Sequence, residues 1–292
     1  MNLVKYIVVG CISAVLYALS LLMISVICLM LAAVTCLIPL KKYRLKCRKQ
    51  WLTLMQQGWV YCNYLIFLIA NGRQFSCEGP KTPDDEHVIV IANHQSWADI
   101  LFLSVMFRSS LPPMKFFLKR SLLWQLPLAG WVCWLLGFPF LYRHSKEEVK
   151  RHPHLKNKDK ETLRDACKQF THLPGSLVIY IEGTRFTKEK HEKQGKPFRH
   201  LLKPRATGLA VVSQELDCAQ WIVNTSLFYE KKGMWAFFSG QCGRLRLHYT
   251  LIPINEYWRG DYENNRDFRK NFQSRLNQVW HENDQWQEEV RR

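Results

Sequence analysis

HVIVIA, at residues 87–92, is a short apolar run rich in β-branched residues, and such runs are typical of a strand buried on both faces of a sheet. A second run of this kind, LVIYI, occupies Leu177–Ile181, and Trp221–Tyr229 and Leu245–Ile252 are further strand candidates. Met114–Leu118 is a shorter one. Longer segments with helical character separate these strands. This alternation predicts an α/β domain with a mostly parallel sheet flanked by helices.

The segments between and after the strands complete this pattern. Helices are expected at Ile100–Phe107, Lys158–His172, Ala206–Leu216 and Asn264–Val290. Two stretches rich in charged residues, 146–160 and 188–203, are expected to be solvated loops. The sequence shows no internal repeat.

The N-terminal region has the properties of a membrane element. Tyr6–Leu40 contains no charged residue, and about 20 helical residues are enough to cross a bilayer core of ~30 Å. The run is too long for a cleaved signal peptide, and no Ala-x-Ala cleavage site follows it. Either one tilted span that continues past the membrane or a hairpin within it accounts for the length.

Basic residues gather directly after this apolar run. Six lysines and arginines lie within residues 41–49, whereas Lys5 is the one basic residue before the run. The positive-inside rule therefore places the rest of the chain on the cytoplasmic face, and the cluster would contact anionic headgroups if the run enters only one leaflet. Trp51–Ala70 fits either an interfacial helix or a buried core helix. Residues 1–70 are expected to anchor the chain and residues 71–292 to form the α/β domain.

The overall charge and the cysteines limit the class of protein. The chain carries 41 Lys and Arg against 24 Asp and Glu, a formal net charge of +17. This excess favours a polyanionic partner: nucleic acid, an anionic membrane surface or a phosphate-bearing substrate. The charge is spread through loops and no nucleic-acid-binding motif is visible, which argues against nucleic acid. The ten cysteines show neither a Cys-x-x-Cys pair nor zinc spacing, so we expect buried thiols in a reducing compartment and no metal site.

A second long uncharged segment lies inside the α/β region. Ser121–Tyr142 has no charged residue, but Pro127, Gly130 and Pro139 interrupt it and are unfavourable inside a helix. A span here would also separate polar motifs on its two sides by a membrane. We therefore expect a buried or membrane-facing segment that lines a channel for an acyl chain.

His94 begins the group of residues that carries chemistry. It lies in Asn93–Asp99 (NHQSWAD), directly after the first strand, where a turn exposes its side chain at the rim of the sheet. Ser96 and Asp99 have the spacing of a capping box, and side chains in a first helical turn lean back toward the N-terminus. Asp99 is therefore expected to orient the His94 imidazole and to balance its charge. Because no Ser or Cys nucleophile in a recognisable elbow accompanies the pair, we expect a substrate hydroxyl to attack a thioester as His94 deprotonates it.

Three further segments supply candidate binding groups. GFPFLYR ends at Arg143, and EGTR, at Glu182–Arg185, directly follows the second buried strand. A Gly-Thr-Arg turn presents backbone N–H groups, a hydroxyl and a guanidinium, which suit a phosphate. Each arginine is equally consistent with a structural ion pair, for example with Glu182. The third segment, KPRATG at residues 203–208, is a basic turn before a helix.

Together, NHQSWAD, GFPFLYR and EGTR, in this order and at this spacing, resemble the glycerophospholipid acyltransferases of the PlsC type, also called the HX4D family. The stretch from Lys119 to Trp131 and the KPRATG turn are similar to this family as well. The resemblance runs from about Trp51 to Leu251. It implies the glycerol-3-phosphate/1-acylglycerol-3-phosphate acyltransferase fold behind an N-terminal helical membrane anchor, with no metal and no prosthetic group.

The resemblance also implies roles for single residues. His94 would be the general base and Asp99 would orient it. Gly137 and Arg143 would belong to acceptor binding. The acceptor's phosphate would be bound by Glu182, Gly183, Thr184 and Arg185, with Arg185 the principal contact and Lys119 a further candidate.

The implied reaction moves an acyl group from acyl-CoA or acyl carrier protein to the sn-2 hydroxyl of lysophosphatidic acid, in phospholipid biosynthesis at the cytoplasmic face of a bacterial inner membrane. The rivals are the same chemistry on lysophosphatidylglycerol or lysocardiolipin, a thioester or lipid hydrolase, and a non-enzymatic protein that binds anionic lipid or nucleic acid. One departure bears on the substrates. The fourth family motif usually carries a proline in an apolar strand, and Ile222–Thr225 has none.

Overall fold

The computed structural model describes residues 3–73, 75–85, 87–125, 128–141, 151, 155–170 and 174–292. Its centre is a six-stranded sheet with the strand order β1-β8-β7-β2-β6-β3. The strands are β1 (Phe75–Glu78), β2 (His87–Ala92), β3 (Met114–Phe116), β6 (Gly175–Tyr180), β7 (Trp221–Tyr229) and β8 (Leu245–Pro253). β7 and β8 are antiparallel, and the other neighbouring strands are parallel. The predicted α/β class with a mostly parallel sheet is therefore confirmed.

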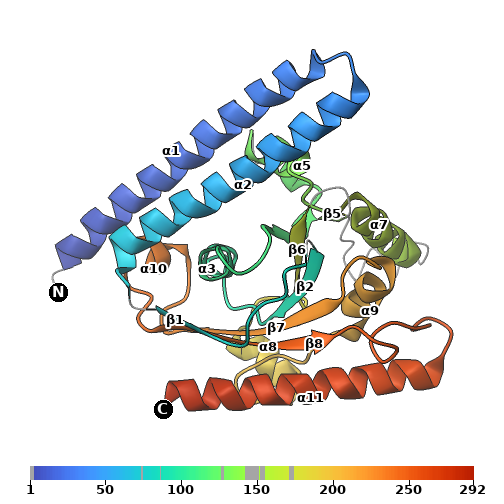
Figure 1. Cartoon of the computed structure of the whole chain (residues 1–292). Helices are drawn as coiled ribbons and strands as arrows, with labels where there is room; N and C mark the ends of the chain where they lie inside the picture. Colours follow the sequence, from blue (N-terminus) through green and yellow to red (C-terminus); the bar gives the residue numbers. More distant parts are fainter. Residues whose placement is uncertain are drawn as a thin grey trace.

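Strand β2 is apolar throughout because both of its faces are covered. Val88 and Val90 belong to a core that also contains α3 (Asp99–Met106) and α10 (Met234–Ser239). Ile89 and Ile91 point to the other face and pack in a second core. That core is closed by three helices, α7 (Leu155–Phe170), α9 (Ala206–Glu215) and α11 (Arg266–Arg291). Figure 1 shows α3 and α10 on one side of the sheet and α7, α9 and α11 on the other.

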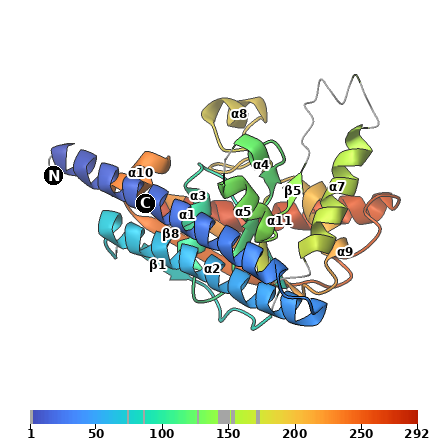
Figure 2. The same ribbon diagram turned by 90° about the horizontal axis from the view of Figure 1, so that it is seen from above.

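A helical hairpin covers the α3 side of the domain. α1 (Leu3–Cys36) is one continuous helix of 34 residues, which corresponds to a length of about 51 Å at 1.5 Å per residue. α2 (Lys41–Asn71) returns beside it, as both ribbon views show (Figures 1 and 2). Within the described residues, α1 is the one helix long and apolar enough to cross a membrane. Because little of it is buried against the rest of the chain, most of its apolar surface is left for another apolar environment.

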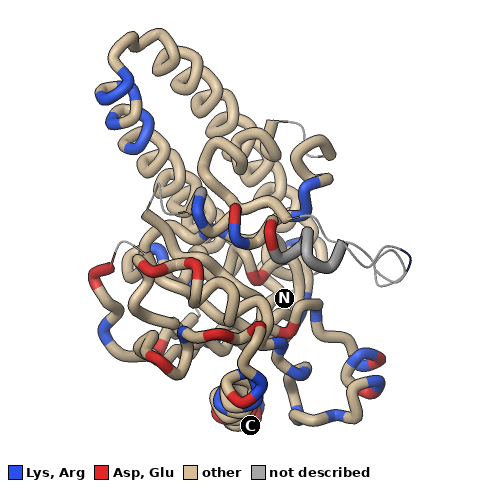
Figure 3. Tube along the Cα trace, turned by 90° about the vertical axis from the view of Figure 1, so that its right-hand side faces the viewer, with Lys and Arg blue, Asp and Glu red and all other residues tan. Residues whose placement is uncertain are grey.

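The two faces of α2 have different surroundings. Trp51 and Phe67 are buried against the rest of the chain, whereas Leu54 and Ile69 are exposed. Both alternatives for Trp51–Ala70 thus describe part of this helix: one face is core and the other is free to meet a membrane surface. Figure 3 shows blue Lys and Arg positions gathered toward the start of α2, in contrast to α1, which has no charged residue after Lys5.

The uncharged segment 121–142 forms short elements in its described part. These are α4 (Leu122–Gln125), α5 (Ala129–Leu135) and β5 (Phe140–Leu141), which pairs with β4 (Leu118–Lys119). Val132 and Leu136 pack with Trp51 and Leu52 of the hairpin. Trp124 is largely exposed. The segment is therefore partly buried under the hairpin and partly exposed, and no helix in its described part is long enough to span a membrane.

Several local expectations need correction. The loop expected at 188–203 contains the short helix α8 (Lys188–Lys193), which begins because the Thr187 side chain accepts a hydrogen bond from the Lys190 N–H. Helix α7 begins at Leu155, inside the loop expected at 146–160. The strand expected at Met114–Leu118 is two strands, β3 and β4, interrupted at Phe117.

Candidate active site

A cavity of about 340 Å³ opens where β2 and β6 end. These strands are parallel and in register, with Ala92 beside Tyr180, so the turns that follow them leave the same edge of the sheet. The cavity joins predicted residues from separate segments of the chain. Its lining includes His94, Lys119, Gly183, Thr184 and Arg185.

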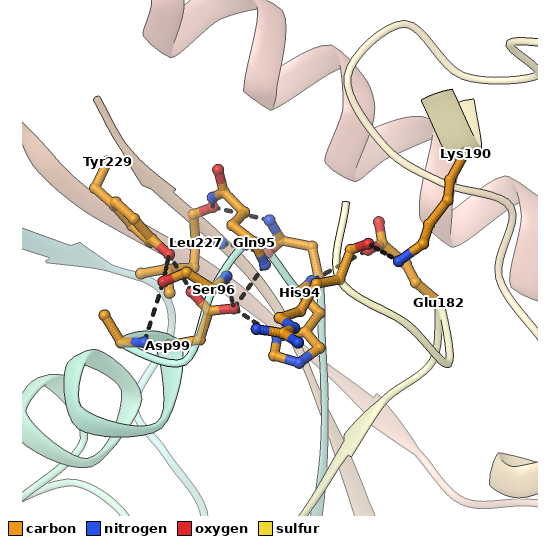
Figure 4. Close-up of polar contacts among 11 residues, drawn as sticks. His94, Gln95, Ser96, Asp99, Glu182, Lys190, Leu227 and Tyr229 are labelled. Carbon is orange, nitrogen blue, oxygen red and sulfur yellow. Dashed lines mark hydrogen bonds and ion pairs between the residues drawn. The ribbon is translucent and has the colours of Figure 1, made fainter. Parts of the chain in front are cut away.

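His94 and Asp99 form a close pair at this edge. The His94 Nδ1 lies 2.7 Å from the Asp99 Oδ2, and the Asp99 side chain is fully buried (Figure 4). A carboxylate only accepts hydrogen bonds, so Nδ1 carries the proton and donates it. This tautomer leaves Nε2 with a lone pair, which is the state that a general base needs.

Asp99 is held by more than His94. Its Oδ2 also accepts hydrogen bonds from the backbone N–H groups of Gln95 (2.6 Å) and Ser96 (3.0 Å). Its Oδ1 accepts from the Tyr229 hydroxyl at the end of β7 (Figure 4). Burial, and next the neighbouring Asp99 charge, raise the pKa of Tyr229 well above its ordinary value, so the phenol keeps its proton and donates it. These contacts fix the carboxylate in position.

The predicted capping box is only half formed. Asp99 reaches back to the Ser96 N–H as expected, but the Ser96 Oγ accepts from the Ala98 N–H (3.0 Å) and lies 2.8 Å from the Tyr229 hydroxyl. The serine therefore ties the turn to β7 in addition to supporting the start of α3. No local pattern predicts the contact of Tyr229 with Asp99, because the two residues lie 130 positions apart along the chain.

Tyr180 holds the plane of the His94 imidazole. Its ring stacks on that of His94, with centroids 4.0 Å apart and planes 12° apart. Tyr180 is the last residue of β6, and its side chain lines the same cavity. Sequence patterning places Tyr180 in an apolar strand and gives no sign that it meets His94.

The backbone of Leu227 in β7 connects the turn after β2 to the C-terminal helix α11. Its carbonyl accepts from the side-chain amides of Asn93 (3.0 Å) and Gln95 (2.7 Å), and its N–H donates to the Asn93 Oδ1 (2.8 Å). Gln287 of α11 donates to the same carbonyl at 2.9 Å. The residues between β2 and α3 are thus fastened to the neighbouring strand by side chains whose roles the sequence did not reveal.

The turn after β6 is more exposed to solvent than the turn after β2. Gly183 has a φ of 69°, in the left-handed region that favours glycine, and Gly183 and Arg185 are exposed. The Arg185 guanidinium lies 5.0 Å from the centroid of the Trp97 ring. Arg205, from the predicted KPRATG turn, lies so close to Gly183 that a Cβ there would be 3.1 Å from its side chain. The turn therefore presents backbone and cationic groups to the cavity.

Glu182 lies behind the turn. Its carboxyl is almost fully buried and accepts hydrogen bonds from the backbone N–H groups of His94 (3.2 Å) and Leu202 (3.0 Å). Burial raises the pKa of Glu182 to about 8. The resemblance implies that Glu182 binds the phosphate, but the structure places its carboxyl against backbone amides, where it supports both turns. The alternative ion pair between Glu182 and Arg185 is likewise replaced by these backbone contacts.

Gly137, Lys119 and Arg143 are the remaining predicted residues. Gly137 has a φ of 75° and follows α5, and it is not part of the cavity lining among the described residues. The pairing of β4 with β5 sets Leu141 beside Lys119, which lines the cavity. Arg143 lies outside the described residues.

Comparison with known proteins agrees with this geometry. The crystal structure of the 1-acyl-sn-glycerophosphate (LPA) acyltransferase PlsC from Thermotoga maritima superimposes with a TM-score of 0.56 at 15% identity, covering 94% of both chains, and this shows a shared fold. The 1-acyl-sn-glycerol-3-phosphate acyltransferase epsilon of Mus musculus is 31% identical over 229 residues, which cover 68% of this chain and 59% of the relative. Lysocardiolipin acyltransferase 1 of Mus musculus is 31% identical over 143 residues, 45% of this chain and 35% of the relative.

The aligned regions therefore span about three-fifths or less of the length of these curated relatives. The family assignment rests on a family-wide match within the chain itself. Residues 74–242, more than half of the 292, match the acyltransferase family and contain the turns after β2 and β6. The chain is thus a member of the acyltransferase family.

Proposed function

We propose that the protein is a 1-acyl-sn-glycerol-3-phosphate (lysophosphatidic acid) acyltransferase that uses acyl-CoA or acyl carrier protein as the acyl donor. One observation carries the proposal. A histidine held by a buried carboxylate shares a single cavity with the cations Lys119 and Arg185 and the hydroxyl of Thr184. Such a cavity can activate a hydroxyl and bind a phosphate on the same molecule.

The reaction follows from the tautomer of His94. Its Nε2 takes the proton from the sn-2 hydroxyl as the hydroxyl oxygen attacks the thioester carbonyl carbon. Asp99, 2.7 Å away, stabilises the imidazolium that forms. When the carbon–sulfur bond breaks, the imidazolium returns the proton to the departing thiolate, and an ester replaces the thioester. General-base catalysis of this kind contributes about 10²–10⁴-fold to the rate.

The other site residues bind and position the acceptor. In this proposal the acceptor's phosphate contacts Arg185 first, with Thr184, the Gly183 backbone and Lys119 completing the site. Glu182 positions the two turns through its backbone contacts. Gly137 and Arg143 are assigned to acceptor binding on the resemblance alone, and Leu122 continues the cavity into the segment expected to hold the acyl chain.

The helical hairpin supports a proposed place for the reaction. α1 would lie in the bilayer, and the basic residues 41–49 would stay with the α/β domain at the cytoplasmic surface of a bacterial inner membrane. Residues 1–70 would then be the anchor and residues 71–292 the catalytic domain. Lysophospholipid and acyl donor meet at such a surface, which brings both reacting groups to His94.

A different lysophospholipid is the second candidate acceptor. One relative is named lysocardiolipin acyltransferase 1, and Ile222–Thr225 lacks the proline of the fourth family motif. Lysocardiolipin and lysophosphatidylglycerol also carry a phosphate and a free hydroxyl, so the same cavity and the same base would serve. Measurement of acceptor choice distinguishes these substrates.

The test is acyl transfer by the detergent-purified protein from labelled oleoyl-CoA to a panel of lysophospholipids, with His94→Ala beside the parent. Transfer to lysophosphatidic acid by the parent alone supports the proposal. Transfer only to another lysolipid keeps the mechanism and changes the acceptor. Release of free oleate that depends on His94, without transfer, identifies a hydrolase. If the parent transfers nothing from oleoyl-CoA, oleoyl-acyl carrier protein is the second donor, and failure with both overturns the proposal.

A further inference from the structure

Lys190 of α8 reaches out of its own helix to the turn after β6. Its Nζ donates to the Thr184 Oγ1 at 2.7 Å and to the Arg185 carbonyl oxygen at 3.1 Å. Figure 4 shows the side chain extended toward this turn, next to Glu182 and His94. The ammonium thus contacts the side chain of Thr184 and the backbone of Arg185, and both residues line the cavity.

The contacts of Lys190 differ from those of the other lysines in this segment. Lys190 is the third residue of the six-residue helix α8, whose Thr187 cap accepts the Lys190 N–H, so it lies within one turn of both helix ends. Other lysines of the segment form ordinary pairs one turn away. Lys193 contacts Glu189 at 2.5 Å and Lys196 contacts Glu192 at 3.6 Å. Lys190 contacts a hydroxyl and a carbonyl instead, and neither neutralises its charge.

The turn therefore has a surplus of positive charge. Lys190 adds to Arg185 and Lys119 around one cavity. Burial raises the pKa of the adjacent Glu182 to about 8, so this carboxyl is mostly uncharged near neutral pH and does not offset the surplus. An ammonium has three N–H donors. Two are used on Thr184 and Arg185, which leaves one for an oxygen of a bound phosphate.

We propose that Lys190 is a positioning and specificity residue: it fixes the Thr184–Arg185 turn and supplies a further cation that favours a phosphomonoester over a phosphodiester. A phosphomonoester carries a charge of about −1.5 to −2 at pH 7, whereas a diester carries a single negative charge. The added cation therefore matters most for the monoester. This inference rests on the proposed function, because it assigns the cavity to an acceptor phosphate.

The first test measures binding without turnover. Dodecyl phosphate and its methyl ester are titrated into the detergent-purified full chain by calorimetry, for the parent, Lys190→Met, Lys190→Arg and Lys193→Met. Loss of Lys190 removes one charge-assisted hydrogen bond, so the Kd for dodecyl phosphate should rise about tenfold in Lys190→Met. The Kd for the methyl ester should rise less. Lys190→Arg should recover most of the binding, and Lys193→Met, on the same helix, should match the parent.

The second test separates KM from kcat with oleoyl-CoA as donor. In Lys190→Met, the KM for lysophosphatidic acid should rise by a similar factor while kcat stays within about threefold, because the His94–Asp99 pair is untouched. Unchanged Kd and KM in Lys190→Met overturn the inference, as does an equal loss of affinity for the monoester and the diester. A parent that transfers nothing, yet binds dodecyl phosphate in a Lys190-dependent way, contradicts the proposed function and supports this inference.

Discussion

The turns after β2 and β6 leave the same edge of the sheet but are built in opposite ways. In the turn after β2, Asp99 is fully buried and each of its oxygens accepts hydrogen bonds from fixed donors. In the turn after β6, Gly183 and Arg185 are exposed, and Gly183 adopts a left-handed backbone. The proposed base is held rigidly, and the groups proposed to bind the phosphate are accessible. This difference suits a reaction in which the proton acceptor must be pre-aligned while the acceptor lipid enters and leaves.

Removal of the base should have the largest effect. His94→Ala deletes the group that takes the hydroxyl proton, so kcat for acyl transfer should fall by at least about 10²–10⁴-fold. Initial rates with labelled oleoyl-CoA measure this loss. His248→Ala is the matched control, because His248 stacks on Trp286 of α11 rather than lining the cavity. Near-parental transfer by His94→Ala would contradict the assignment of the whole site.

A smaller loss should follow from Asp99→Asn. The amide can still occupy the space, but it offers a donor where three N–H groups and a hydroxyl now point, and it cannot balance the imidazolium. We expect kcat to fall about 10–100-fold, as for the loss of a hydrogen bond to a charged group, with little change in the KM for the acceptor. If the KM rises and kcat is retained, Asp99 acts in binding rather than in catalysis.

Substitution in the turn after β6 should change the KM for the acceptor rather than kcat. Arg185→Ala removes a guanidinium from an exposed turn and leaves the His94–Asp99 geometry unchanged, so the KM for lysophosphatidic acid should rise about tenfold or more. Arg275→Ala is a matched control, since Arg275 lies over Tyr257, away from the cavity. An unchanged KM in Arg185→Ala would remove the phosphate role from Arg185 and keep His94 as the base.

The same contrast explains what the sequence could predict. β2, β6 and the His94–Asp99 pair were predictable because their signals are local: continuous β-branched runs and a five-residue spacing just after a strand. Tyr229, Gln287 and Tyr180 were missed because their contacts with the catalytic turn join distant segments. Lys190 was hidden in a charged stretch that resembles a solvated loop, although a threonine cap orders it into a helix.

Glu182 lies between the two turns, and its substitution should have the smallest effect on the reaction. Its carboxyl joins the backbone of His94 to that of Leu202, and Leu202 is held by Trp280 of α11, whose Nε1 donates to its carbonyl at 2.9 Å. Glu182→Gln keeps an acceptor oxygen and removes the ionisable proton. Because Glu182 supports the turns from behind, we expect kcat and the KM for the acceptor to stay within about threefold of the parent.

The effect of Glu182 should instead appear in the pH dependence of stability. The pKa of Glu182 is about 8 in the folded chain and 4.5 as the ordinary value, so between these values the folded state holds a proton that the unfolded state has lost. The free energy of unfolding should therefore fall as pH rises from 5 to 8, with a contribution from this group of up to about 1.4 kcal/mol per pH unit. Glu182→Gln should flatten this slope in urea unfolding measured at several pH values. If parent and variant keep the same slope and the variant loses affinity for the acceptor, Glu182 is charged and contacts the phosphate site directly, and the two turns are less distinct than their burial indicates.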